Sequence, residues 1–129
     1  MKNNPIDKKL KKYSSIESEI AFLETELWSA KEMLKTLDEF KVHIESNVQG
    51  KVNKRIQDLK EELKNLEAEK MAIESMVDTL EDDVKRIFKY RYFSGLSWLD
   101  IAKKMGFSER QIRRIHQNAI EKISSENIF

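Results

Sequence analysis

The stretch VKRIFKYRYFSGLSWLDIAKKMGFSERQIRRIHQNAIEKI, residues 84–123, decides the fold of the C-terminal third of the chain. Glycines follow helical patterns at two points, where their tolerance of left-handed backbone can end a helix. A Ser-x-x-Asp and a Ser-x-x-Gln sequence each mark a capping box that starts a helix. These signals are Gly95, Ser97 with Asp100, Gly106, and Ser108 with Gln111. A short helix, a glycine-containing turn and a second capped helix predict a helix-turn-helix.

The second of these helices, from Ser108 to about Ile123, separates into two faces at 100° per residue. Its apolar face is predicted to join the core and holds Ile112, Ile115, Ala119 and Ile123. The opposite face holds Arg110, Arg114, Gln117 and Glu121, with Arg113 on its shoulder. Arginine can donate two hydrogen bonds to guanine and glutamine can pair with adenine in the major groove. We therefore predict that DNA bases are read by Arg110, Arg113, Arg114 and Gln117.

A second group of residues is expected to hold DNA phosphates, which fix register without specifying sequence. The start of the first motif helix offers free amides and the positive end of a helix dipole. The expected phosphate-binding residues are Ser97, Trp98, Lys103, Lys104, Ser108 and Lys122. Aromatic residues at 88–93 could stack on single-stranded bases, but at a helix end we expect them in the core.

Charge is segregated along the chain although the net charge is only +1. Residues 14–84 carry nine Lys or Arg against eighteen Asp or Glu, whereas residues 85–123 carry ten Lys or Arg against three acids. Residues 1–13 carry five Lys and one Asp, and we expect them to form a flexible basic arm. Segregation of this kind favours a polyanion-binding module attached to an acidic support.

The acidic region has apolar residues at alternating steps of three and four, which predicts a coiled coil over residues 14–80. One series runs from Ile16 to Val48 with an interruption at Lys41, and a second runs from Val52 to Ile87 with one at Lys70. The phase changes at Gly50, where we expect a turn. Ser14 and Glu17 form a plausible capping box at the start.

Two topologies fit this pattern, an antiparallel hairpin and a continuous rod that dimerises in parallel. We favour the hairpin because helices beyond about 25 residues need special support. A reversal at Gly50 would place Val48 beside Val52, Leu37 beside Leu63, Leu27 beside Ile73, and Ala30 across from Lys70. Further apolar residues around the seam, among them Phe22, Trp28 and Met33, favour a homodimer in which two hairpins form a bundle.

Several functional classes find no support in the sequence. Cys is absent, which excludes disulfides and thiolate metal sites, and the two histidines, His43 and His116, are too few for a metal site. No phosphate loop or nucleophile elbow is present, so we expect neither an enzyme nor a cofactor. No apolar run is long enough to span a membrane, and a cytoplasmic location fits best.

The run from Arg91 to Ile123 resembles region 4 of bacterial sigma factors, and more closely the late-transcription regulators of phages and prophages of the RinA and ArpU type. The resemblance rests on Tyr90-Arg91-Tyr92, Gly95-Leu96-Ser97-Trp98, Ile101-Ala102, Gly106 to Gln111, and Ala119 before Glu121-Lys122. By position it implies DNA contacts at Arg110, Gln111, Arg113 and Arg114, and RNA polymerase as a second partner. No sigma region 2 precedes the motif, so a complete sigma factor is not implied.

These observations predict an all-α protein with a coiled-coil hairpin and a C-terminal helix-turn-helix domain over residues 81–129. The expected function is sequence-specific binding of double-stranded DNA in transcription regulation, as an activator of phage or prophage late genes. Two alternatives stay open at this point. One is a small terminase subunit that recognises phage DNA for packaging, and the other is a coiled-coil adaptor that binds RNA polymerase.

Overall fold

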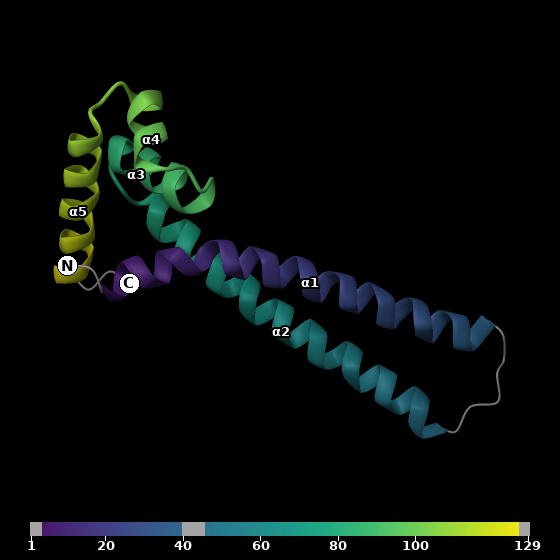
Figure 1. The fold of residues 1–129 in the computed structure, drawn as a ribbon. Coiled ribbons are helices and arrows are strands. Elements are labelled where there is room, and N and C mark those ends of the chain that lie inside the picture. The colour runs from purple at the N-terminus through teal and green to yellow at the C-terminus, as the bar shows by residue number, and fades with distance from the viewer. Residues whose placement is uncertain (1–3, 40–45, 127–129) are drawn as a thin grey trace. The chain divides into compact units, whose positions relative to one another are not determined.

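The computed structural model describes residues 4–39 and 46–126, and all of the secondary structure described is helical (Figure 1). The elements are α1 (Pro5–Glu39), α2 (Ser46–Asp78), α3 (Asp82–Phe88), the π-helical turn η1 (Lys89–Phe93), α4 (Trp98–Met105) and α5 (Glu109–Ser125). The long helices α1 and α2 form a hairpin, and the shorter helices follow it. The predicted fold class is therefore confirmed. No described helix is long and apolar enough to cross a membrane.

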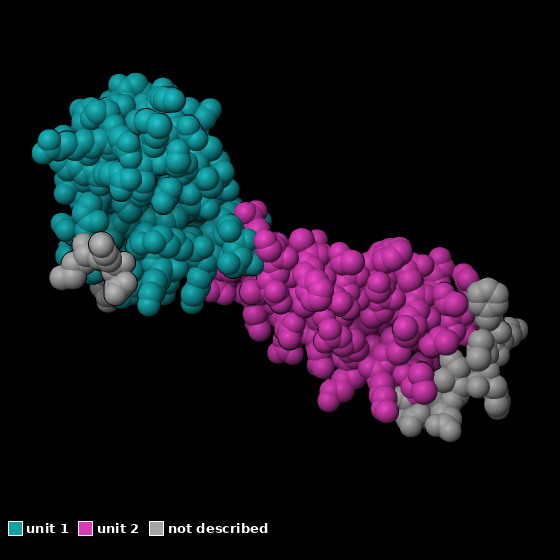
Figure 2. Space-filling view, in the orientation of Figure 1, with its two compact units in different colours: residues 1–15, 70–129 teal, residues 16–69 magenta. Residues whose placement is uncertain are grey.

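The chain divides into two compact units (Figure 2). Unit 1 contains residues 1–15 and 70–129, and unit 2 contains residues 16–69. Unit 1 thus combines the predicted helix-turn-helix with the N-terminal end of α1 and the C-terminal end of α2. The predicted boundaries at residues 14 and 81 placed both of these helix ends outside the C-terminal domain.

Unit 2 is a two-helix seam. Leu23 of α1 is buried together with Leu59 and Leu63 of α2, and partly buried apolar residues pack around them: Ile20, Leu27, Ala30 and Leu66. This clustering confirms a hairpin but not the predicted register, which placed Leu63 beside Leu37. Lys70, predicted across from Ala30, instead lies over the ring of Tyr13 in unit 1, with Nζ 5.8 Å from the ring centroid.

The predicted turn at Gly50 is wrong. Gly50 lies inside α2, is exposed, and has no left-handed backbone. Helix α1 ends at Glu39 and α2 begins at Ser46. The seam positions Lys41 and Ile44, and His43, lie outside the described residues. Glycine weakens a helix interior but does not forbid it, so the phase change at this point marks no helix end.

The structure also corrects the expected flexible arm. Helix α1 begins at Pro5, a favoured first helical residue, and the side chain of Asn4 accepts a hydrogen bond from the amide of Ile6 at 2.8 Å. Ser14 and Glu17 lie well inside α1 and do not cap it. Residues 5–13 are helical because their apolar side chains belong to the core: Ile6, Leu10 and Tyr13 are buried.

The core of unit 1 is formed by side chains from every helix that enters the unit. The buried residues include Leu10 from α1, Ile73 and Val77 from α2, Ile87 and Phe88 from α3, Tyr92 from η1, Ile101 and Ala102 from α4, and Ile112, Ile120 and Ile123 from α5. Helix α5 packs against both α3 and α4. The N-terminal segment of the chain therefore completes the core on which the helix-turn-helix is built.

Candidate nucleic-acid interface

The helix-turn-helix consists of α4, a short turn and α5. Ser97 caps α4, and its hydroxyl accepts the amide of Asp100 at 3.1 Å. Gly106 ends α4 in the left-handed conformation, with φ of 73°. The predicted capping box of α5 is present in both directions, because the Ser108 hydroxyl accepts the Gln111 amide and the Gln111 side chain accepts the Ser108 amide. The helix boundaries predicted from these signals are confirmed.

The buried face of α5 differs from the predicted one. Ile112 and Ile123 are buried as expected, but His116 and Ile120 take the places given to Ile115 and Ala119. Ile115 and Ala119 are half-buried and line a groove of about 330 Å³ together with residues of α3 and of the connection between α2 and α3. The prediction failed because it assigned the core by apolarity, whereas His116 enters the core with its polar atoms satisfied.

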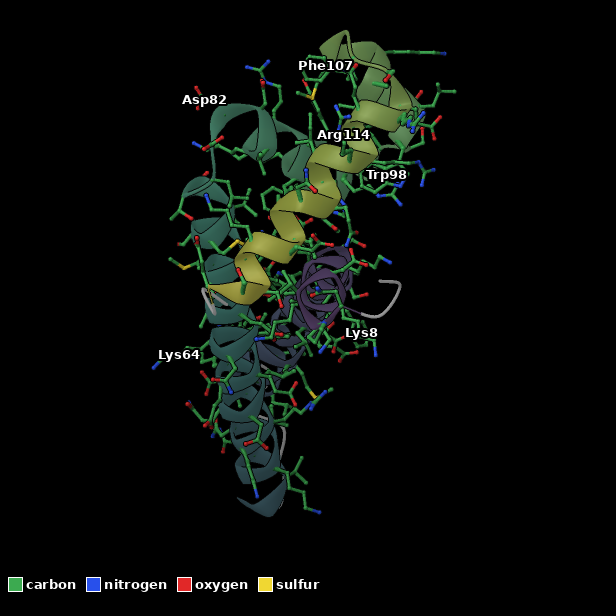
Figure 3. All side chains as sticks on the ribbon, turned by 90° about the vertical axis from the view of Figure 1, so that its left-hand side faces the viewer. Lys8, Lys64, Asp82, Trp98, Phe107 and Arg114 are labelled. Atoms are coloured by element: carbon green, nitrogen blue, oxygen red, sulfur yellow. The ribbon has the colours of Figure 1, made fainter. Side chains whose placement is uncertain are left out.

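Arg110 and Arg114 project from the N-terminal half of α5 and are exposed. Within the described part of the chain neither guanidinium forms a hydrogen bond or an ion pair. Figure 3 shows the position of Arg114 on α5. These two arginines are therefore available to an external ligand without breaking a contact within the protein.

The other predicted base-reading residues are held by neighbours. Arg113 donates to Glu109 at 3.0 Å in an exposed i,i+4 ion pair. Gln117 is half-buried, and its amide donates to Glu121 at 3.2 Å. The side chain of Gln111 accepts the Ser108 amide in the capping box. Binding a base through Arg113 or Gln117 requires exchange of these contacts, and such exposed pairs contribute only about 0–1 kcal/mol.

The predicted phosphate-binding residues do not gather at one place. Ser97 and Trp98 lie at the start of α4, and Lys103 and Lys104 are exposed in its last turn. Ser108 precedes α5, and its hydroxyl is used in the capping box. Lys122 lies in the last turn of α5, more than two turns away from Arg114 on the same helix. It lines the same groove as Ile115 and Ala119.

Sequence reasoning missed an arginine–tryptophan cluster at the start of α4. The guanidinium carbon of Arg91 lies 4.3 Å from the Trp98 ring centroid, and that of Arg113 lies 5.6 Å from it. Arg91 also donates to the carbonyl oxygen of Leu96 at 3.1 Å. Cations over an aromatic face are held in place while their outer edge stays accessible. The spacing of Arg91 and Trp98 along the chain gives no signal of this contact, because it depends on the path of the backbone through Gly95.

Sequence reasoning also missed a buried polar chain that joins α1, η1 and α5. The hydroxyl of Tyr92 donates to the Asp7 carboxylate at 2.6 Å and is hydrogen-bonded to Nε2 of His116. Because the single tyrosine proton is used on Asp7, Nε2 of His116 must carry a proton and donate to Tyr92. The ring of His116 also packs edge-on against Trp98, with centroids 4.7 Å apart.

Burial and hydrogen bonding shift the pKa values of this chain. Burial lowers the pKa of His116 to about 4, with Asp7 opposing and Arg91 and Lys11 adding to the shift. Burial raises the pKa of Tyr92 well above its usual value, and the hydrogen bond to Asp7 adds to this. Burial also raises the pKa of Asp7, but the hydrogen bonds from Tyr92 and Lys11 outweigh it and leave that pKa below its usual value. At neutral pH, His116 is therefore neutral and Asp7 ionised.

A family model described as "Protein of unknown function (DUF722)" matches residues 2–125, nearly the whole chain. Comparisons with curated proteins and with solved structures gave no match. The family model thus covers the hairpin and the helix-turn-helix together.

Proposed function

This chain belongs to the DUF722 family of proteins of unknown function, and we propose that it is a sequence-specific double-stranded DNA-binding transcription regulator. The helix that enters the major groove is α5, whose N-terminal half presents its side chains to the bases, as in other helix-turn-helix proteins. The N-terminus of α4 and the basic side chains around it contact the phosphate backbone.

The observation that carries this proposal is the free, exposed pair Arg110 and Arg114 on a capped helix. Arginine that reads guanine must present its guanidinium fork outward from a helix whose own orientation is fixed. Helix α5 meets this requirement, since its start is fixed by a complete capping box and its inner face is buried in the core of unit 1. Arg113, which is held beside Trp98 and Glu109, is suited to contact a phosphate or to bind at the edge of the site.

The resemblance of residues 91–123 to sigma region 4 and to regulators of the RinA and ArpU type supports a more specific role. On this basis the regulated genes are late genes of a phage or prophage, activation is the sign of regulation, and RNA polymerase is the second partner. The position of Arg110 and Arg114 at the start of the second motif helix supports the DNA contact in this role.

We further propose that the chain forms a homodimer through unit 2. Phe22, Trp28 and Met33 of α1 are 55%, 64% and 55% exposed, and exposed apolar surface of this kind favours a protein partner. The thin seam of unit 2 leaves this surface open. Sedimentation equilibrium tests the proposal: the wild type should have a dimer mass, and Phe22→Glu with Met33→Glu should have a monomer mass. A monomer mass of the wild type at all concentrations contradicts it.

The DNA proposal is tested by sequencing the duplexes that the protein retains from a random pool. The wild type should enrich one motif, and Arg110→Ala with Arg114→Ala should lose that enrichment while retaining its helical content. A matched control is Arg55→Ala with Lys60→Ala, which removes two exposed positive charges from unit 2 and should retain the motif.

Other outcomes distinguish the alternative functions. Salt-sensitive binding without any enriched motif would contradict sequence-specific reading, because the basic face would then be only an electrostatic footprint. The packaging subunit and the polymerase adaptor would then be favoured. No duplex binding, combined with capture of RNA polymerase that survives the arginine substitutions, would favour the polymerase adaptor.

A further inference from the structure

The first turns of α1 carry a dense set of positive charges on the same compact unit as the helix-turn-helix. Lys8, Lys9, Lys11 and Lys12 are all exposed. The acid within residues 4–15 is Asp7, and its carboxylate already accepts from Tyr92 and pairs with Lys11 at 2.9 Å. In the described structure, Lys8 and Lys12 pair with no carboxylate. The net charge of this face is thus strongly positive.

This basic face is fixed to the helix-turn-helix by three kinds of contact. Ile6, Leu10 and Tyr13 are buried, the ring of Tyr13 stacks on that of Phe93 with centroids 4.2 Å apart, and Asp7 accepts from Tyr92. The lysines are therefore not on a tether that samples many positions. Because they are already ordered, their binding to a ligand costs less conformational entropy than that of a disordered arm.

Lys8 and Lys12 do not help α1 to form, unlike Lys11, which pairs with Asp7. The N-terminus of a helix is the positive end of its dipole, so a lysine in the first turn, such as Lys8, is unfavourable there. Neighbouring lysines at positions 8 and 12 also repel each other on the helix surface. Burial of the apolar face of α1 offsets this cost. A positive cluster that the fold does not require indicates a negatively charged ligand.

The basic face continues the candidate DNA interface. Arg113 and Arg91 both lie over Trp98, Trp98 packs on His116, and Tyr92 joins His116 to Asp7. Lys11 pairs with Asp7, and Lys8 follows it in the chain. Figure 3 shows Arg114, Trp98 and Lys8 toward the right-hand side of the view and Asp82 on the left. Contacts through the core of unit 1 thus connect the start of α5 to the basic face of α1.

We propose that Lys8, Lys11 and Lys12 of α1 form a second phosphate-binding face, which holds the DNA backbone beside the site that α5 reads. This inference rests on the proposed DNA-binding function and extends it. Phosphate contacts made from a fixed element set the register and orientation of the recognition helix and add affinity that does not depend on sequence. The segment from Pro5 to Tyr13 is thereby both a core element of unit 1 and a part of its DNA-binding surface.

The test uses the full chain with Lys8→Gln and Lys12→Gln, which leaves the pair between Lys11 and Asp7 intact. Affinity for an enriched duplex, extended at each end by about one helical turn of roughly 10 bp, is measured by fluorescence anisotropy over a series of salt concentrations. Loss of two phosphate contacts should make the slope of log K against log salt shallower by about 1–2 and weaken low-salt binding by roughly tenfold. The preferred motif should not change.

Two further variants make the result specific. Lys8→Arg with Lys12→Arg keeps both charges and should restore the wild-type slope. Lys54→Gln with Lys60→Gln removes two exposed lysines from unit 2 and should leave the slope within about 0.3 of the wild-type value, since charges outside the footprint release no condensed counterions.

The failure of this inference is distinguishable from the failure of the proposed function. A wild type that enriches a motif, together with a Lys8/Lys12 variant of unchanged slope and affinity, overturns the second phosphate-binding face alone. An equal loss in the unit 2 control also overturns it, because the effect is then one of net charge. A wild type that binds no duplex overturns the DNA-binding function and this face with it.

Discussion

Unit 1 and unit 2 share the two long helices α1 and α2, yet they bury their side chains differently. In unit 1, Leu10, Phe88, Ile101, Ile112 and other side chains from all of its helices are almost wholly buried. In unit 2, the buried cluster consists of Leu23, Leu59 and Leu63, with partly buried residues around it, and large apolar side chains stay exposed on α1.

The two units are therefore suited to different tasks. A core with contributions from several crossing helices fixes the orientation of each helix, which a base-reading surface requires. A two-helix seam fixes only the pairing of its helices and leaves their outer faces open to a partner. On the proposed function, unit 1 reads DNA and unit 2 joins two copies of the chain.

The largest effect is expected from Leu10→Ala. If the N-terminal segment completes the core of unit 1, this change removes a fully buried side chain and lowers the free energy of unfolding by about 2–5 kcal/mol. Chemical denaturation followed by tryptophan fluorescence and circular dichroism measures the loss. Lys12→Ala, at an exposed position nearby, should change it by less than about 0.5 kcal/mol. If Leu10→Ala lowers the free energy of unfolding by no more than Lys12→Ala does, the N-terminal segment is a flexible arm and not part of the core.

The next largest effect is a loss of stability at acidic pH, which arises from unit 1. The folded-state pKa of His116 is about 4, below its ordinary 6.5, so the unfolded chain takes up a proton at this residue before the folded chain does. The free energy of unfolding should therefore decrease as the pH falls from about 6.5 to 4, by up to about 1.4 kcal/mol per pH unit. The low pKa of Asp7 acts in the same direction at still lower pH.

The check is a series of denaturation curves between pH 4 and pH 7 for the wild type and for His116→Gln, whose amide can still donate to Tyr92. The variant should show a shallower dependence on pH across this window. Parallel curves for the two proteins would mean that His116 is not held neutral by burial.

The smallest effects are expected from replacing one glycine in each unit by alanine. Gly106 has φ of 73°, so Gly106→Ala should destabilise unit 1 by about 1–2 kcal/mol. Gly50 lies in the interior of α2 with no atom in contact range of an added methyl group, so Gly50→Ala should stabilise the hairpin by about 0.5–1 kcal/mol. Thermal unfolding measures both. Destabilisation by Gly50→Ala would support a turn at this residue.

The hairpin was predictable from sequence, but its register was not. Moving the reversal from Gly50 to the segment between Glu39 and Ser46 shifts the pairing by roughly two heptads, and such a shift keeps the same apolar stripes facing each other. The deciding signal was the seam that continues through Tyr13, Leu10 and Ile6 toward the N-terminus. The lysines between these residues obscured it, although Asn4 and Pro5 are a recognisable helix start.

The helix-turn-helix was predictable because its ends are set by local chemistry. Ser97, Gly106 and Ser108 act through neighbours within a few residues, so sequence alone located them. His116 was misplaced because its partners come from Tyr92 in η1 and Asp7 in α1, far away in the chain. The stacking of Arg91 and Arg113 on Trp98 depends on the same tertiary arrangement. Contacts of this range leave no periodic pattern in the sequence.

The most direct test of the central claim is the ratio of affinities for an enriched duplex and for a scrambled duplex of equal length, measured at one salt concentration. If Arg110 and Arg114 read bases, the wild type should prefer the enriched duplex, and Arg110→Ala with Arg114→Ala should lose about 1–3 kcal/mol of that preference per arginine. The scrambled duplex should be affected much less. Equal losses on both duplexes would contradict base reading by α5 and leave the two arginines as phosphate contacts.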